Sequence, residues 1–304
     1  MQDIDNQRKG KGELLKRVIS GIGIAIPAIF VTLSGGYLFT IFVMILVWLA
    51  SYELYTLLEL KGQSPKMKTG IVSSCSIVLA SYFFAPEFLF GLLTFSLITI
   101  FLSQLASRVV RGATDTIMMT FFGTIYVGWL ASHIVFIREL GKELEKVHGE
   151  KIKSIISSSH GDLGAFCVFL VVATTVFADI GAYFGGKRWG NIKIASKISP
   201  GKTLEGFLSG TASAIVVSLC VKWLFSAKGD ISHYIIYGIV MSIVGLLGDL
   251  AESLIKRDVE VKDSGFIMPG HGGILDRIDS LLFTVPVSYY IFKYYLEKVL
   301  IPIV

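Results

Sequence analysis

Long apolar segments fill most of this 304-residue sequence and constrain its fold more than any other feature. A helix needs about 20 apolar residues to cross the hydrocarbon core of a membrane. Nine segments approach that length, at residues 18–34, 37–58, 69–86, 88–106, 114–137, 163–186, 204–225, 231–255 and 281–303. With 53% hydrophobic and 17% charged residues, the composition argues against a soluble protein. The sequence predicts an all-α fold, a polytopic integral membrane helical bundle with about nine transmembrane helices.

The polar residues are distributed unevenly along this bundle. Residues 1–17 are polar and basic and lead into an apolar run without a convincing cleavage site, which favours a retained first helix over a secretion signal. The densest polar sequence lies in the second half of the chain. We therefore expect a single transmembrane domain over residues 1–304, with a catalytic half at about 163–303 and supporting helices at 18–137.

The positions of lysine and arginine predict the orientation in the membrane. If the N-terminus is inside, 19 of the 28 basic residues fall in inside segments. An odd number of spans then places the C-terminus outside, and the polar loops of the second half face the cytoplasm. This distribution also accounts for the net charge of +5 without a nucleic-acid partner.

Residues 138–162, between the fifth and sixth spans, mix charges of both signs. Nothing in this stretch has the spacing of metal ligands or nucleophiles, so we expect a solvated loop or a short surface helix. The histidines outside the main polar segment lack partners at useful spacing, and we expect them at an interface or on the surface: His133, His148, His160 and His233.

The main polar segment covers residues 253–280 and is preceded by further charges. Two helix faces carry its charged residues at spacings of three and four: Asp249, Glu252, Ser253 and Lys256 on the first, and Asp276 with Asp279 on the second. Clustered carboxylates at membrane depth persist mainly where a cation compensates them, and oxygen ligands of this kind suit Mg²⁺. We predict a magnesium site formed by Asp249, Asp276 and Asp279, and leave a second cation open.

Residues 269–273 read Pro-Gly-His-Gly-Gly, and glycines of this kind expose backbone amides to phosphate. Four cationic side chains flank this loop: Lys256, Arg257, Lys262 and Arg277. Cations, amides and metal-holding carboxylates together predict a site for phosphoryl or nucleotidyl transfer.

The segment follows the pattern SxxKRxxxxKDxGxxxPGHGGxxDRxDS, which resembles the diagnostic motif of the phosphatidate cytidylyltransferase (CDP-diacylglycerol synthase) family. Two upstream pieces are also similar to that family: Asp179, Gly181, Ala182, Tyr183 and Gly186, and then Ser199, Pro200, Lys202, Thr203, Glu205 and Gly206. The resemblance covers about residues 179–280. The first half of the chain matches only in being helical and apolar.

This resemblance implies transfer of CMP from CTP to phosphatidate, with Mg²⁺ as cofactor, in a bilayer and with a homodimer left open. The catalytic residues that we predict are Asp249, Lys256, Arg257, Lys262, Asp263, His271, Asp276, Arg277 and Asp279. The substrate-binding residues that we predict are Asp179, Tyr183, Ser199, Lys202, Thr203, Glu205, Gly272 and Gly273.

Three alternative functions compete with this interpretation, and one alternative structure competes for residues 199–205. A CTP-dependent polyprenol or phytol kinase would use similar residues but attack the γ-phosphorus, and a transporter would be expected to show internal repeats. The Gly-Lys-Thr at 201–203 resembles a Walker A loop, but Ser196 occupies the position of its first glycine. Residues 199–205 could instead be a helix start with proline in the first turn.

Overall fold

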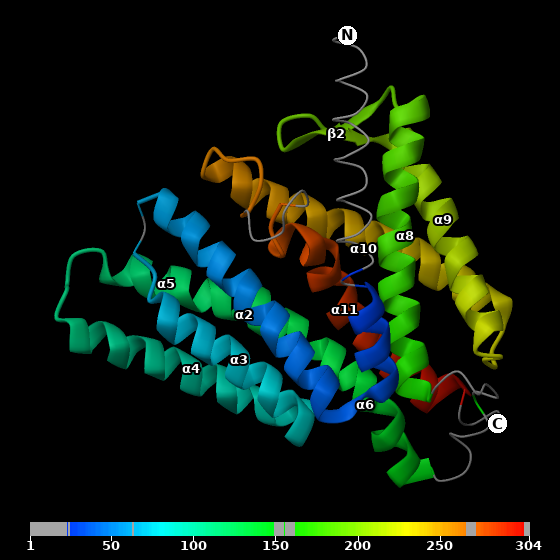
Figure 1. The fold of residues 1–304 in the computed structure, drawn as a ribbon, viewed down its shortest axis with the longest axis horizontal. Helices are drawn as coiled ribbons and strands as arrows, with labels where there is room; N and C mark the ends of the chain where they lie inside the picture. Colours follow the sequence, from blue (N-terminus) through cyan, green and yellow to red (C-terminus); the bar gives the residue numbers. More distant parts are fainter. Residues whose placement is uncertain are drawn as a thin grey trace.

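The computed structural model describes residues 23, 25–62, 64–148, 155, 162–265 and 272–300, and most of them are helical (Figure 1). A short helical segment, Ala25–Ser34, precedes the elements labelled in the figure. The N-terminal half contains α2 (Gly36–Leu60), α3 (Met67–Phe83), α4 (Pro86–Ser107), α5 (Ala113–Gly123), the π-helix η1 (Thr124–Trp129) and α6 (Leu130–His148). The C-terminal half contains α8 (Leu163–Trp189), β1 (Lys193–Ala195), β2 (Ser199–Thr203), α9 (Leu204–Leu224), α10 (Ile231–Asp258), α11 (Leu275–Tyr295) and η2 (Leu296–Leu300).

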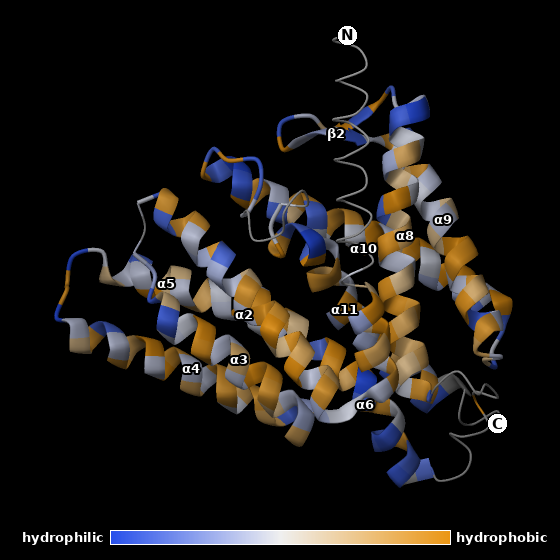
Figure 2. Cartoon of the chain, in the orientation of Figure 1, coloured by the Kyte–Doolittle hydropathy of each residue, from blue (hydrophilic) through white to orange (hydrophobic). Residues whose placement is uncertain are grey.

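In the described part of the chain, six helices are long and apolar enough to cross a membrane. They are Gly36–Leu60, Pro86–Ser107, Ala113–Lys146, Leu163–Trp189, Leu204–Leu224 and Ile231–Asp258. Figure 2 shows apolar residues along the length of these helices and hydrophilic residues mainly at their ends. A polytopic helical membrane protein is therefore confirmed.

The predicted number of nine spans is not confirmed. Ala25–Ser34 and α3 are apolar but shorter than the spanning helices, and α11 is not among the six. The predicted first span begins in residues outside the described part, and the predicted last span ends there.

The expectation of an all-α fold is wrong at one place, because β1 and β2 form an antiparallel hairpin. Lys193 pairs with Thr203 in this hairpin. The alternative of a helix start at 199–205 is therefore wrong for its first residues, and α9 begins only after Thr203, whose hydroxyl accepts the Gly206 N–H at 3.2 Å. Pro200 lacks an N–H, which an isolated two-stranded hairpin tolerates.

Arg138 contradicts the prediction of a solvated segment at 138–162. It lies inside α6, is 3% exposed, and donates from Nε to the backbone oxygen of Thr32 at 2.7 Å. Its Nη1 pairs at 3.0 Å with Asp162, which also accepts the Ala165 N–H at 2.8 Å and so caps α8. The charged residues from Arg138 to His148 therefore belong to the last part of α6, which ends at His148.

His133 is also buried rather than interfacial. It is 2% exposed, and its ring lies 5.7 Å from the ring of Tyr289 between centroids. The apolar surroundings of α11 therefore cover it, and this contact could not be read from neighbouring positions in the sequence.

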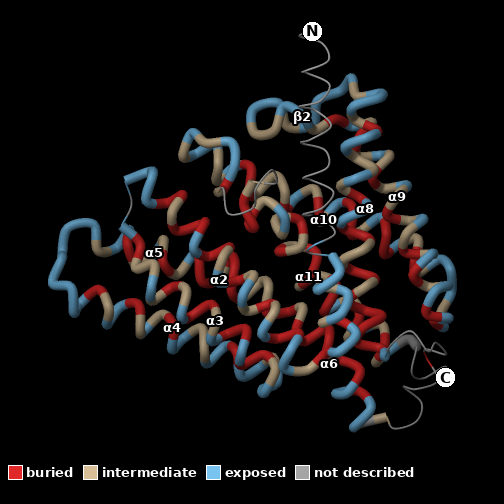
Figure 3. The backbone as a smooth tube through the Cα atoms, viewed as in Figure 1, coloured by how far each residue is buried: buried red, intermediate tan, exposed pale blue. Residues whose placement is uncertain are grey.

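α11 joins the two halves of the molecule. It contacts α2 and α6 of the N-terminal half and α8 and α10 of the C-terminal half. One hydrophobic core includes buried residues of both halves, such as Leu54, Val171 and Leu282. Figure 3 shows buried segments running through the adjoining faces of these helices.

Candidate active site

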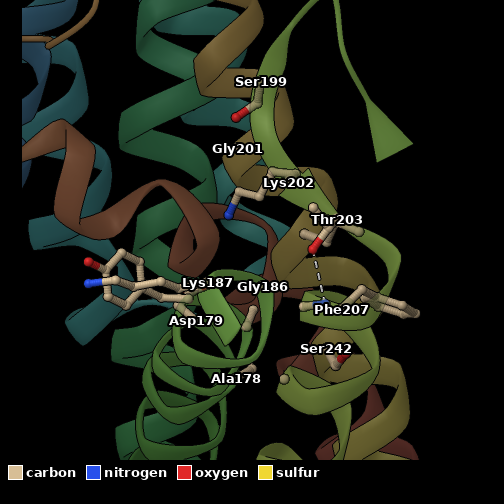
Figure 4. Close-up of a pocket in the computed structure, with 15 residues that line it drawn as sticks. Ala178, Asp179, Gly186, Lys187, Ser199, Gly201, Lys202, Thr203, Phe207 and Ser242 are labelled. Carbon is tan, nitrogen blue, oxygen red and sulfur yellow. Dashed lines mark hydrogen bonds between the residues drawn. The ribbon is translucent and has the colours of Figure 1, made fainter. Parts of the chain in front are cut away.

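A cavity of about 340 Å³ opens where α8, α9 and the hairpin meet (Figure 4). Five of the predicted substrate-binding residues line it: Asp179, Tyr183, Ser199, Lys202 and Thr203. The helices approach closely there because their facing residues are small. A Cβ at Gly206, for example, would lie 2.8 Å from the backbone oxygen of Ala182. Residues from three sequence segments therefore form one cavity.

Two residues that line this cavity, Asp179 and Lys202, belong to a cluster of charges. The Lys202 ammonium extends from β2 and forms an ion pair with Asp249 of α10. Asp179 and Asp279 lie close enough for their charges to act on Lys202 and on each other. Burial alone would lower the pKa of Lys202, but these three carboxylates raise it above its usual value. The lysine therefore carries its charge at neutral pH.

The three carboxylates around Lys202 have the chemistry that a divalent cation requires. Their oxygens are hard ligands, and a single ammonium group does not balance three negative charges. As they are placed, no three acidic, thiol or imidazole side chains of the described residues form a group that could hold a metal ion. The ammonium group of Lys202 lies among these carboxylates in the structure. The structure thus brings together Asp249 and Asp279 of the predicted metal set and adds Asp179.

Asp276, the third member of that set, has different partners. It accepts from the Lys256 ammonium at 2.7 Å, from the Ser264 N–H at 3.1 Å and from the Gly273 N–H at 2.9 Å. Lys256 also pairs with the fully buried Glu252, one turn earlier on α10. This second cluster holds both described ends of the motif loop against α10 and α11.

The first of the two helical faces predicted in the motif, the one on α10, has the contacts that its spacing indicates. Glu252 and Lys256 form an (i, i+4) ion pair, and the Ser253 hydroxyl lies 3.4 Å from the Asp249 carboxylate. Both pairs lie on α10, so the spacing in the sequence correctly indicated which side chains meet.

Other predicted residues contact the backbone of the protein. Glu205 accepts the N–H groups of Asn191 at 3.0 Å and Ile192 at 3.2 Å, and so fastens the hairpin to α9. Arg257 donates to the backbone oxygen of Ile198 at 3.1 Å. These contacts fix the hairpin that carries Lys202.

The remaining predicted residues lie near the motif loop. Lys262, Asp263 and Arg277 are exposed, and Gly272 has a φ of 80°, which favours glycine. His271 lies outside the described residues, together with residues 266–270.

Tyr126 is a residue of the site that the sequence did not indicate. It belongs to η1, a π-helical turn inside a long helix, a feature often found at functional sites. The side chain is 6% exposed, and its hydroxyl has no hydrogen-bond partner among the described residues. It lies close enough to Glu252, Asp279 and Asp249 to experience their charges. A tyrosine within a predicted apolar span has no feature in the sequence that would indicate its place beside these carboxylates.

Comparison with known proteins agrees with the motif. The cytidylyltransferase family matches residues 15–295 of the chain. A phosphatidate cytidylyltransferase of Synechocystis is 35% identical over 285 residues, covering 90% of this chain and 95% of that protein. The phosphatidate cytidylyltransferase of Bacillus subtilis is 30% identical over 282 residues, covering 92% and 97%.

A plant protein extends this similarity. The chloroplastic phosphatidate cytidylyltransferase 4 of Arabidopsis thaliana is 31% identical over 302 residues, which cover 96% of this chain and 77% of that protein. These matches reach well beyond the segment 179–280 that carries the motifs. The chain therefore belongs to the cytidylyltransferase family, among relatives named phosphatidate cytidylyltransferase.

Proposed function

We propose that this protein is a membrane enzyme that transfers CMP from CTP to phosphatidate and releases pyrophosphate. The observation that carries the proposal is that Asp249 and Asp279 lie close to Lys202, which lines one cavity together with other residues of the family motifs. The membership of the family and the names of its relatives support the same reaction.

The reaction needs no nucleophile from the protein. An oxygen of the lipid phosphate attacks the α-phosphorus of CTP, the bond from that phosphorus to the bridging oxygen breaks, and pyrophosphate leaves with the electron pair. The residues of the chain hold the two phosphates and balance their charge. Lys202 supplies an ammonium at the cavity, and Arg257 holds the hairpin from which it extends.

Mg²⁺, when bound, would neutralise charge on the phosphate oxygens. We propose Asp249, Asp276 and Asp279 as its ligands, with Asp179 near enough to contribute and a second cation left open. The excess of carboxylates over ammonium groups around Lys202 supports this assignment.

The acyl chains of the lipid fit the outer surface beside the cavity. Tyr183 and Phe184 of α8 and Leu208 of α9 are large, apolar and exposed there. We propose that the lipid enters laterally along this surface and that CTP arrives from the cytoplasm.

The distribution of basic residues supports a cytoplasmic site, with the N-terminus inside and the C-terminus outside. A homodimer stays a prediction, to be checked by measuring the mass of the purified protein in detergent.

Labelled nucleotides test the reaction directly. Purified protein is incubated with phosphatidate, Mg²⁺ and CTP labelled at the α-phosphorus, the γ-phosphorus or the cytosine. We expect the α-phosphorus and the cytosine in the lipid product and the γ-phosphorus in pyrophosphate. Appearance of only the γ-label in lipid would establish a kinase, and lipid or solute uptake without CTP turnover would establish a transporter.

A further inference from the structure

Glu53 is a buried carboxylate in a largely apolar helix. It lies on α2, in the half of the chain that carries no family motif, and it is 2% exposed. A buried charge is strongly unfavourable unless hydrogen bonds compensate it. Its partners therefore indicate why this position is acidic.

Among the described residues, the three hydrogen-bond donors of Glu53 all belong to the motif segment. Glu53 accepts the backbone N–H of Ile274 at 3.0 Å, the N–H of Leu275 at 2.8 Å and the hydroxyl of Ser264 at 3.2 Å. Ile274 is the N-cap of α11 and Leu275 is its first residue, and the first N–H groups of a helix lack partners within the helix. A negative charge there also interacts favourably with the helix dipole. Glu53 thus caps α11 from a position more than 200 residues earlier in the chain.

Two glycines of the motif make room for this carboxylate. A Cβ at Gly265 would lie 2.7 Å from Oε1 of Glu53, and the three nearest heavy atoms it would meet all belong to Glu53. A Cβ at Gly273 would meet Ser264 and the other oxygen of Glu53. Gly273 was predicted to bind substrate, and these contacts assign it a packing role against Glu53. The motif and the helix α2 fit together as one unit.

The helix that Glu53 caps carries two of the proposed catalytic carboxylates. Asp276 lies in its first turn, and Asp279 lies one turn later. A shift at the start of α11 would move Asp276 from Lys256 and Asp279 from the Lys202 cluster. We propose that Glu53 is a positioning residue for nucleotidyl transfer, which holds α11 where Asp276 meets Lys256 and Asp279 lies near Lys202; this inference rests on the proposed function.

The first test replaces Glu53 by glutamine, with Glu59→Gln as the control, because Glu59 is exposed on the same helix. Glutamine keeps the size of the side chain but lacks its negative charge. One of its oxygen acceptors is replaced by an NH₂ group, which cannot accept the backbone N–H of Ile274 or Leu275. We expect kcat per folded molecule to fall by about 10- to 100-fold, as for other residues that orient catalytic ligands. KM for CTP should change much less. Unchanged kcat in Glu53→Gln would overturn the proposal, even if less folded protein were recovered.

The second test is a double-mutant cycle with Gly265→Ala and Glu53→Asp. Alanine alone should lower kcat because the three nearest atoms that its Cβ would meet belong to Glu53, and aspartate alone should lower it because the carboxylate is withdrawn. In the double variant the shorter carboxylate makes room for the methyl group. The kcat of the double variant should therefore be higher than the value obtained by multiplying the two single decreases. Effects that simply multiply would show that Gly265 and Glu53 are independent, contrary to the proposal.

Hydrogen exchange distinguishes failure of this proposal from failure of the proposed function. The amides of Ile274 and Leu275 should exchange faster in Glu53→Gln than in Glu59→Gln, and this measurement requires no turnover. Equal exchange rates in the two variants would show that Glu53 does not cap α11. If the labels establish γ-phosphoryl transfer instead, the reaction assignment fails, and the same variants assayed on that reaction test the positioning role.

Discussion

The two halves of the chain carry their polar residues in opposite ways. In the C-terminal half, acidic and basic residues are concentrated in recognisable motifs around one cavity. In the N-terminal half, isolated polar residues such as Glu53 and Tyr126 are buried singly in apolar helices and lie against the motif residues. The motif half therefore contains the residues that we propose to act on the substrates, and the other half supplies buried partners that contact or approach some of them.

Removal of divalent cations should have the largest effect, because it acts on the motif half as a whole. Without a cation the carboxylates around Lys202 face the like charge of the triphosphate. We expect no measurable CMP transfer in EDTA and recovery when Mg²⁺ is added in excess, measured by transfer of α-label to lipid. Full activity in metal-free buffer would remove the magnesium assignment and leave Lys202 as the main electrostatic group.

Replacement of Asp279 by asparagine should lower kcat by about 1,000-fold or more, since one ligand of a catalytic cation loses its charge. The same is expected for Asp276→Asn. The Asp279 variant should be as stable as the wild type or slightly more stable in the absence of metal, because repulsion from Asp249 and Asp179 is relieved. Asp258→Asn is a suitable control, as Asp258 is exposed and forms a surface ion pair with Lys61. Wild-type turnover in both motif variants would place the site elsewhere.

Lys202→Met should lower kcat/KM for CTP by about 100-fold, which corresponds to roughly 3 kcal/mol. Methionine keeps the length of the side chain but leaves Asp249 without its ion-pair partner. Lys197 lies on the same hairpin and is exposed, so Lys197→Met separates a specific effect from a general loss of positive charge. Equal kinetics for the two variants would exclude Lys202 from CTP binding.

Tyr126→Phe tests whether the N-terminal half also supplies a group that contacts the substrates. A hydrogen bond from the Tyr126 hydroxyl to a bound phosphate or water would contribute about 1 kcal/mol, so we expect a three- to tenfold decrease in kcat/KM. Stability without substrate should not decrease, because the hydroxyl has no partner among the described residues. Tyr52→Phe, at an exposed position on α2, provides the control. Unaltered kinetics in Tyr126→Phe would restrict the N-terminal half to positioning.

Asp162→Asn should have the smallest effect on catalysis. Asp162 pairs with Arg138 and caps α8, so its replacement should lower the unfolding temperature and cost about 1–2 kcal/mol of stability. We expect kcat per folded molecule within about twofold of the wild type, because a helix cap acts on stability rather than on the transition state. A large decrease in kcat at unchanged unfolding temperature would show that this end of the molecule is coupled to the reaction.

The spacing of residues along single helices predicted part of the site correctly. The shared face of Asp249, Ser253 and Lys256 follows from helical periodicity, and α10 has that geometry. The contact of Glu53 with the start of α11 could not be predicted in this way. It depends on how helices distant in the sequence pack, and a single glutamate in an apolar run contains no information about its partner.

The hairpin escaped prediction for a different reason. Its five-residue strand, Ser199–Thr203, contains proline and glycine and lacks the alternation that normally indicates a strand. The burial of Arg138 was missed because an alternating charge pattern is typical of exposed helices. Burial of a charge by a single opposing partner and a few carbonyl groups leaves no such periodic pattern.

The length of α8 has a consequence for the depth of these groups in the membrane. Asp162 precedes its first residue and Asp179 lies 17 residues later, so the two carboxylates are about 25 Å apart along the axis. The hydrocarbon core of a bilayer is about 30 Å thick. If α8 crosses the membrane, the Arg138–Asp162 pair and the catalytic carboxylates lie near opposite surfaces. Both of these charged groups then remain within reach of water and lipid head groups, and the mostly apolar residues of α8 between them occupy the middle of the bilayer.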